Sequence, residues 1–124
     1  MYLIHWPLGY YAEPKKPLHV LWAEMEALVA KGLTKSIGVS NFNTQILWDL
    51  LTYAKIPPVV NQFEINPQLT NSELVKFCIA KNIRPTAYTP VGRVGWTEGP
   101  PGWEDPSKNE WLQGLAKKYN KSVV

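Results

Sequence analysis

The chain has 124 residues, of which 45% are hydrophobic and 19% are charged, and its formal net charge is +3. This composition is typical of a folded protein rather than a disordered one, and the length limits the chain to one domain. The small charge and the lack of lysine or arginine runs make nucleic acid a poor candidate partner, whereas a pI near 9.0 is compatible with phosphate-bearing ligands.

The single cysteine, Cys78, excludes an internal disulfide and any zinc-type cysteine spacing, so we expect a buried, inert thiol and no metal site. No apolar run reaches the roughly 18 residues of a membrane span, and no signal-peptide pattern is present. We therefore expect a cytoplasmic protein without a membrane partner. Met1 directly precedes the first strand pattern and "NKSVV" completes no element, so we expect a piece of a longer protein.

Strand and helix patterns alternate four times along the chain. Apolar stretches predict strands at residues 1–5, 35–40, 58–65 and 84–91. Apolar residues at steps of three and four predict helices at 17–32 and 44–55, and two more helices follow the polar clusters at 70–73 and 107–110. This alternation favours a parallel sheet covered by helices.

Capping residues support the helix starts. Asn43 is a candidate N-cap, and Thr70 with Glu73 and Ser107 with Glu110 have the spacing of capping boxes. The last helix is then expected to turn an apolar stripe inward, formed by Leu112, Leu115, Ala116 and Tyr119.

Residues 90–106 form a long segment of glycine, proline and two tryptophans after the fourth strand pattern. Loops of this length in compact domains are usually functional or disordered, and tryptophans are unusual in a disordered linker. We expect an ordered binding loop, and a packed surface Ω-loop is the alternative.

Polar or aromatic side chains stand where each predicted strand ends. They are His5 and Trp6, Ser40 and Asn41, Gln62, and Tyr88 and Thr89. In parallel sheets ligands bind at the carboxyl ends of the strands, so together these residues predict a single site. Taken singly, each has a structural alternative, as a core histidine, a cap, a turn residue or a core aromatic.

These groups favour a particular chemistry. His5 can donate to a carbonyl oxygen or exchange a proton near neutral pH, and Trp6 beside it suggests an apolar pocket wall. The row of Ser40, Asn41 and Gln62 has the donors and acceptors to bind a planar carboxamide. A tyrosine ring such as that of Tyr88 can stack on a flat heterocycle.

The motifs "LIHWP", "KSIGVSNFN", "VVNQFEINP" and "IRPTAYTPVG" resemble successive signatures of the aldo-keto reductases. Members of this family are (β/α)8 barrel enzymes that use NADPH, less often NADH, to reduce aldehydes and ketones. The resemblance implies an α/β fold of the TIM-barrel type in which this chain supplies strands four to seven. Residues 1–124 would then be part of an NADP-dependent oxidoreductase domain, acting on a small-molecule aldehyde or ketone.

The resemblance also implies a role for each strand-end residue. His5 matches the histidine that orients the substrate carbonyl, and Trp6 matches a wall of the substrate pocket. The cofactor-binding positions are matched by Ser40, Asn41 and Gln62 at the nicotinamide carboxamide, by Tyr88 stacking on the ring, and by Thr89, Val91, Gly92 and Arg93 in the loop over the pyrophosphate. Arg93 could pair with a phosphate or face solvent. Asn66 replaces a histidine common in the family, a change that we expect to matter little.

The family's general acid is a tyrosine supported by a lysine and an aspartate, and no tyrosine of this chain matches it. We therefore expect the chain alone to be inactive. Half a barrel also leaves two unpaired strand edges, so we expect the isolated chain to self-associate and the full-length protein to be a monomer.

Two other readings remain. One is a non-enzymatic barrel of the same family, acting as a cofactor-binding regulatory or structural subunit; the "HWP" motif favours the enzyme. The other is an unrelated phosphate-binding barrel such as an isomerase or aldolase, which needs a lysine or carboxylate at a strand end. The nearest carboxylate is Glu64, which we expect to anchor a neighbouring residue.

Overall fold

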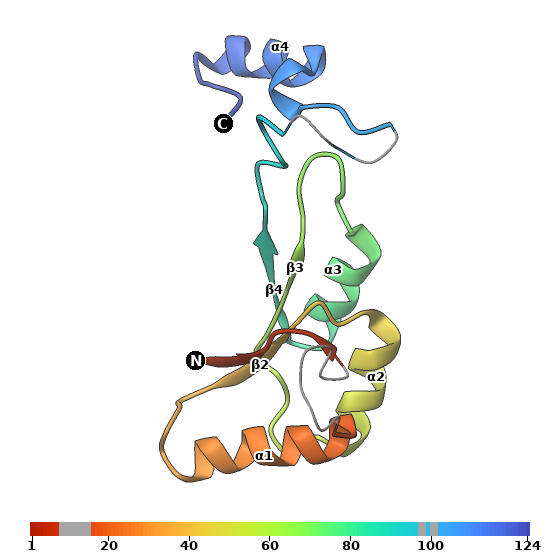
Figure 1. Cartoon of the computed structure of the whole chain (residues 1–124), viewed down its shortest axis with the longest axis vertical. Coiled ribbons are helices and arrows are strands. Elements are labelled where there is room, and N and C mark those ends of the chain that lie inside the picture. Colours follow the sequence, from red (N-terminus) through yellow and green to blue (C-terminus); the bar gives the residue numbers. More distant parts are fainter. Residues whose placement is uncertain (8–15, 97–98, 100–101) are drawn as a thin grey trace. The chain divides into compact units, whose positions relative to one another are not determined.

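The computed structural model describes residues 1–7, 16–96, 99 and 102–124, and strands alternate with helices along them (Figure 1). The strands are β1 (Tyr2–Ile4), β2 (Ile37–Ser40), β3 (Val60–Glu64) and β4 (Arg84–Tyr88). The helices are α1 (Leu18–Ala30), α2 (Thr44–Tyr53), α3 (Ser72–Ala80), the short 3-10 helix η2 (Pro106–Lys108) and α4 (Glu110–Tyr119). The predicted alternation is confirmed.

The strands form one sheet in the order β1-β2-β3-β4. β1 pairs with β2, and β2 with β3, in parallel register, with Ile4 opposite Val39 and Ser40 opposite Gln62. Parallel pairing places the carboxyl ends of these three strands at one edge of the sheet, where the predicted site residues begin.

Gly38 permits this close pairing in the middle of β2. A Cβ atom there would lie 2.8 Å from Leu3 Cδ2 and 2.8 Å from the carbonyl oxygen of Val60. Any larger residue would therefore force the neighbouring strands apart.

The chain divides into two compact units. The first contains Met1–Phe63 and Asn71–Thr86, and the second contains Glu64–Thr70 and Ala87–Val124. Every buried hydrophobic side chain of the described residues, proline aside, belongs to the first unit. Its centre is formed by Trp22 and Met25 of α1, Ile37 and Val39 of β2, and Leu47 and Leu50 of α2. Burial of each such side chain contributes about 1.5–3 kcal/mol, so this core stabilises the unit that carries the ends of β1 and β2.

The helix starts were only partly predictable. Asn43 caps α2 as predicted, because its Oδ1 accepts from the N–H of Ile46 at 2.9 Å. The Thr70–Glu73 box is wrong, since α3 begins at Ser72 after Asn71, whose backbone is left-handed with φ 45°. With Asn71 as the N-cap, Glu73 is the second residue of the helix, whereas a capping box needs the glutamate at the third position.

The second predicted capping box is also wrong. Asn109 caps α4 by accepting from the N–H of Leu112 at 3.1 Å. Ser107 instead lies in η2 and donates both its N–H and its hydroxyl to Asp105 Oδ1. These two hydrogen bonds hold the pKa of the Asp105 carboxyl below its usual value.

The apolar stripe of α4 exists but is not buried. Leu115 is 40% exposed and Tyr119 is 62% exposed, and no residue of α4 is buried. The stripe lines a hollow of about 230 Å³ together with residues 121–123. The inward orientation predicted for this stripe is therefore wrong within the described part of the second unit.

The predicted loop 90–106 lies partly outside the described residues, at positions 97–98 and 100–101. Among the described helices, none is long and apolar enough to cross a membrane.

Candidate functional site

Three of the predicted site residues stand at the end of a strand of the first unit or directly after it: His5 follows β1, Ser40 ends β2, and Asn41 follows Ser40. Gln62, which was predicted at a strand end, is instead the central residue of β3, opposite Ser40. Ser40 is buried and Gln62 is half-buried, whereas His5 and Trp6 are exposed. The His5 and Trp6 rings lie 5.8 Å apart between centroids. The structure thus brings together polar residues from three neighbouring strands.

Hydrogen bonds tie these strand ends together. The Asn41 N–H and the Ser40 hydroxyl both donate to the carbonyl oxygen of Gln62, at 2.8 and 2.7 Å. Asn41 Nδ2 donates to the carbonyl oxygen of His5 at 2.9 Å and to Ser40 Oγ at 3.1 Å. Asn41 adopts a left-handed backbone, with φ 62°, which asparagine tolerates better than most residues. Asn41 therefore forms hydrogen bonds that connect all three strands at this edge of the sheet.

Two polar groups of this network remain available to a ligand. Neither Asn41 Oδ1 nor the side-chain amide of Gln62 has a hydrogen-bond partner within the described part of the chain. Together they offer acceptors and donors at the carboxyl edge of the sheet. The Ser40 hydroxyl proton, in contrast, is used by the Gln62 carbonyl.

The remaining predicted cofactor residues lie in the second unit. The carbonyl oxygen of Tyr88 accepts from the Ile65 N–H at 3.4 Å, and Thr89 follows with a left-handed backbone, φ 50°. Such a conformation is an outlier for a β-branched residue and costs about 1–3 kcal/mol. The Thr89 carbonyl then accepts from the N–H of Gly92 at 2.9 Å, which closes a turn that includes the exposed Val91.

Gly92 is buried in this turn with φ 71°. A Cβ atom there would lie 2.7 Å from Pro106 Cγ, so both the backbone conformation and the contact require glycine.

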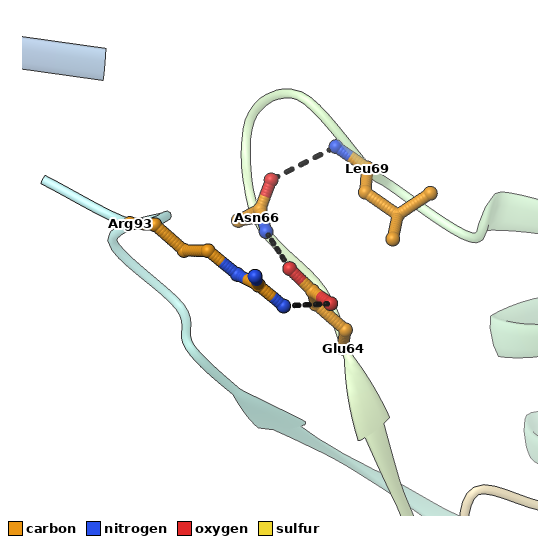
Figure 2. Close-up of polar contacts among 4 residues, drawn as sticks. All are labelled: Glu64, Asn66, Leu69 and Arg93. Atoms are coloured by element: carbon orange, nitrogen blue, oxygen red, sulfur yellow. Dashed lines mark hydrogen bonds and ion pairs between the residues drawn. The ribbon is translucent and has the colours of Figure 1, made fainter. Parts of the chain in front are cut away.

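Arg93 is anchored rather than free in solvent. Figure 2 shows its guanidinium facing the carboxylate of Glu64, with Nη2 and Oε2 3.9 Å apart. On its other side the guanidinium lies 4.3 Å from the centre of the Trp96 ring. Glu64 thus anchors a neighbour, as predicted.

Asn66 extends this cluster. Its Nδ2 donates to Glu64 Oε1 at 3.1 Å, and its Oδ1 accepts from the N–H of Leu69 (Figure 2). The same Oδ1 also accepts from the N–H of Gln68. Asn66 is also buried. The cluster lines a hollow of about 260 Å³ with Trp103.

Sequence reasoning missed Asn61, a fully buried residue beside Gln62. Its signal was an amide at an inward position of an apolar strand. No cluster of metal-binding side chains occurs within the described ranges.

Comparison with known proteins decides the family. The sequence model of the aldo/keto reductase family matches residues 1–121. The chain belongs to this family.

Among relatives, the chain is 46% identical to aldose reductase C of Dictyostelium discoideum, covering 100% of this chain and 42% of that protein. It is 39% identical to aldo-keto reductase family 1 member A1-A of Danio rerio, covering 98% and 42%. The chain therefore spans less than half the length of these aldo-keto reductases.

Solved aldo-keto reductases share the fold. One crystallised with NADPH matches with a TM-score of 0.86 and 34% identity, over 98% of this chain and 38% of that one. A Bombyx mori aldo-keto reductase in complex with NADP matches with a TM-score of 0.81 and 38% identity, over 98% and 41%. The four parallel strands of this chain are thus part of a (β/α)8 barrel, and the predicted fold class is confirmed.

Proposed function

We propose that the parent protein, meaning the complete gene product that includes residues 1–124, is an NADPH-dependent reductase of aldehydes or ketones. The observation that carries this proposal is the tied strand edge, where Asn41 Oδ1 and the Gln62 amide are left for a ligand. Family membership and relatives solved with NADPH or NADP support it. We also propose that the protein is a cytoplasmic monomer.

The available groups fit a carboxamide. A carboxamide presents two N–H donors and one carbonyl acceptor in a plane, and Asn41 Oδ1 can accept from it while the Gln62 NH2 group donates to it. Ser40 acts indirectly in this proposal, because its hydroxyl holds the Gln62 carbonyl. NADPH, when bound, supplies a hydride to the carbonyl carbon of the substrate.

The other strand-end residues have distinct tasks. His5, exposed at the end of β1, donates a hydrogen bond to the substrate carbonyl oxygen, and Trp6 forms an apolar wall for the substrate. Tyr88 supplies a ring for stacking on the nicotinamide, at half-buried exposure. The turn of Thr89, Val91 and Gly92 places its backbone against the pyrophosphate, and Arg93 pairs with a phosphate oxygen.

Residues 1–124 alone are proposed to lack turnover. No residue of the chain matches the family's tyrosine acid, and loss of a positioned acid costs about 10²–10⁴ in rate. We expect no NADPH oxidation when the isolated chain is given a reactive aldehyde. Turnover within about tenfold of a relative would mean that another residue supplies the proton. Tyr10 and Tyr11, the first candidates, lie outside the described residues.

The experiment that tests the function uses the parent protein. NADPH absorbance is followed with a panel of aldehydes and ketones, and cofactor binding is titrated for wild type, Asn41→Ala, Gln62→Ala and Tyr88→Ala. Each variant should weaken NADPH binding by about fivefold, the equivalent of one hydrogen bond or stack. Tight NADPH binding without any turnover would instead favour the regulatory or structural subunit. Three unchanged affinities would contradict the proposed site.

A further inference from the structure

Asn61 is a fully buried amide at the second position of β3, between Val60 and Gln62. Successive residues of a strand point to opposite faces, so Asn61 lies on the face opposite to its neighbour Gln62. A buried amide is costly unless its donors and acceptor are paired. Its partners therefore indicate why an amide stands at this position.

Both polar atoms of the Asn61 side chain form hydrogen bonds with the backbone of Phe42. Its Nδ2 donates to the carbonyl oxygen of Phe42 at 2.9 Å, and its Oδ1 accepts from the Phe42 N–H at 3.4 Å. Nδ2 also faces Cys78 Sγ at 3.8 Å. The Asn61 side chain thus hydrogen-bonds both the N–H and the carbonyl of Phe42, as a residue of a neighbouring strand would do, and fixes the Phe42 backbone.

Phe42 directly follows Asn41, the residue that ties the strand ends together. The Asn41 N–H pairs with the Gln62 carbonyl at 2.8 Å, and the Phe42 side chain is 1% exposed. β3 therefore holds the left-handed turn at Asn41 by hydrogen bonds from two residues, through the backbone of Gln62 and through the side chain of Asn61. Without the hydrogen bonds of Asn61, the Phe42 peptide could rotate and change the position of Asn41 Oδ1.

We infer that Asn61 is a positioning residue for the nicotinamide end of the site, acting through the Phe42 peptide to fix the direction of Asn41 Oδ1. This inference rests on the proposed function, in which that oxygen accepts from the carboxamide. Asn61 itself touches neither cofactor nor substrate, since it is 0% exposed. Its contribution is confined to the nicotinamide half of NADPH.

The experiment compares two ligands in the parent protein. NADPH carries the nicotinamide, whereas 2′,5′-ADP has only the adenosine half. The dissociation constant of NADPH divided by that of 2′,5′-ADP therefore isolates the contribution of the nicotinamide end. This ratio does not depend on the fraction of competent protein, because both apparent constants scale with that fraction. Asn61→Ala should raise the ratio by about five- to tenfold, with 2′,5′-ADP affinity unchanged.

Two further variants keep the test decisive. Asn61→Ser leaves a smaller polar group that cannot reach both Phe42 atoms, so it should show the same selective loss if Asn61→Ala fails to fold. Cys78→Ala is the matched control, because Cys78 is also 0% exposed and contacts Asn61 but has no hydrogen bond to Phe42. It should lower the melting temperature and leave the ratio unchanged.

The outcomes separate this inference from the proposed function. If Asn41→Ala leaves NADPH binding unchanged, the proposed site itself fails. If Asn41→Ala raises the ratio and both Asn61 variants leave it at the wild-type value, Asn61 does not position Asn41 and the inference is overturned. An equal loss of both ligands in the Asn61 variants would assign Asn61 a purely structural role and also overturn it.

Discussion

The backbone N–H of Asn41 donates to the carbonyl oxygen of Gln62 over 2.8 Å. This bond connects the residue that follows β2 to the central residue of β3. The bond uses backbone groups only. It therefore fixes the two residues relative to each other without using Asn41 Oδ1 or the Gln62 amide. Predictions can be made for this edge, for the turn beyond β4 and for the buried thiol of Cys78 in α3.

The first prediction concerns Ser40. Ser40→Ala removes the hydrogen bond to the Gln62 carbonyl and an acceptor for Asn41 Nδ2. We expect the free energy of unfolding of the parent protein to fall by about 1–2 kcal/mol, and NADPH binding to weaken less than in Asn41→Ala. Chemical denaturation and cofactor titration measure the two effects. Thr34→Ala is the matched control, because the Thr34 hydroxyl also donates to a nearby backbone carbonyl, that of Ser36, at 2.9 Å. An equal effect of the two variants on NADPH binding would contradict the special place of Ser40.

The second prediction concerns the charge on Arg93. Glu64 lies 3.9 Å from its guanidinium. If Arg93 binds a cofactor phosphate as proposed, this carboxylate competes with the phosphate for the guanidinium. Arg93→Ala should weaken NADPH binding by about tenfold or more, as expected for a charge-assisted hydrogen bond. Glu64→Gln should tighten binding by up to about fivefold, because a half-exposed ion pair contributes little that must be replaced.

Titration of both variants at low and high salt checks this prediction. Arg84→Ala is the control, since it removes the same charge from an exposed arginine at the start of β4. Weaker binding by Glu64→Gln than by wild type would mean that the carboxylate supports Arg93 instead of competing for it.

The third prediction concerns Gly92. Gly92→Ala forces alanine into a backbone with φ 71° and places its Cβ against Pro106. The left-handed backbone costs about 1–2 kcal/mol, and overpacking adds about 1–3 kcal/mol. Gly32→Ala has nearly the same φ, 70°, with no atom within 4 Å of the added Cβ. The difference between the two variants in unfolding free energy thus reports the Pro106 contact, and equal losses would show that this contact relaxes freely.

The fourth prediction concerns pH. Burial raises the pKa of the Cys78 thiol above its ordinary value of 9.0, so the folded protein keeps this proton at a pH where the unfolded chain loses it. The stabilisation is fully present below pH 9.0 and is lost as the pH rises above that value. Burial and the neighbouring Asp49 raise the pKa of Tyr53 to about 12, so this residue also makes the protein less stable at high pH. Its effect cancels when wild type is compared with Cys78→Ala, because both proteins contain Tyr53.

The measurement is the unfolding free energy of wild type and Cys78→Ala as a function of pH. The stability advantage of wild type should be constant at neutral pH and should shrink above pH 9.0. Parallel curves across that range would show that the thiol ionises equally in both states. A thiol reagent should also label native Cys78 slowly, because the side chain is 0% exposed.

The strand ends could be predicted from the sequence because their signals are local. An apolar run followed by a histidine, or by "SN" before a helix cap, marks a strand end whatever its partners are. The helix starts at 72 and 110 were harder, since Thr70, Asn71 and Ser72 are all good caps, as are Asp105, Ser107 and Asn109. Only the backbone conformation, such as φ 45° at Asn71, decides which one is used.

Asn61 was beyond local pattern reading. Its partner Phe42 lies 19 residues earlier in the chain, so no window of sequence around Asn61 contains both. The Glu64–Arg93 contact is similarly distant in sequence. Strand alternation alone places Asn61 on the face opposite to Gln62, and the identity of its partner came from the pairing of β2 with β3.

That pairing has a consequence for how the sheet assembles. Val39 stands opposite Asn61 and Ser40 opposite Gln62, and the side chains of a strand alternate between its faces. A slip of β3 by a single position would exchange the two amides, turning Asn61 outward and burying Gln62 among apolar side chains. The Phe42 peptide would lose its partner, and a longer amide would enter a core with no matching groups. Asn61 and Gln62 differ in length, so each fits only its own face of the strand. A register shift of β3 is therefore destabilising even when no ligand is present.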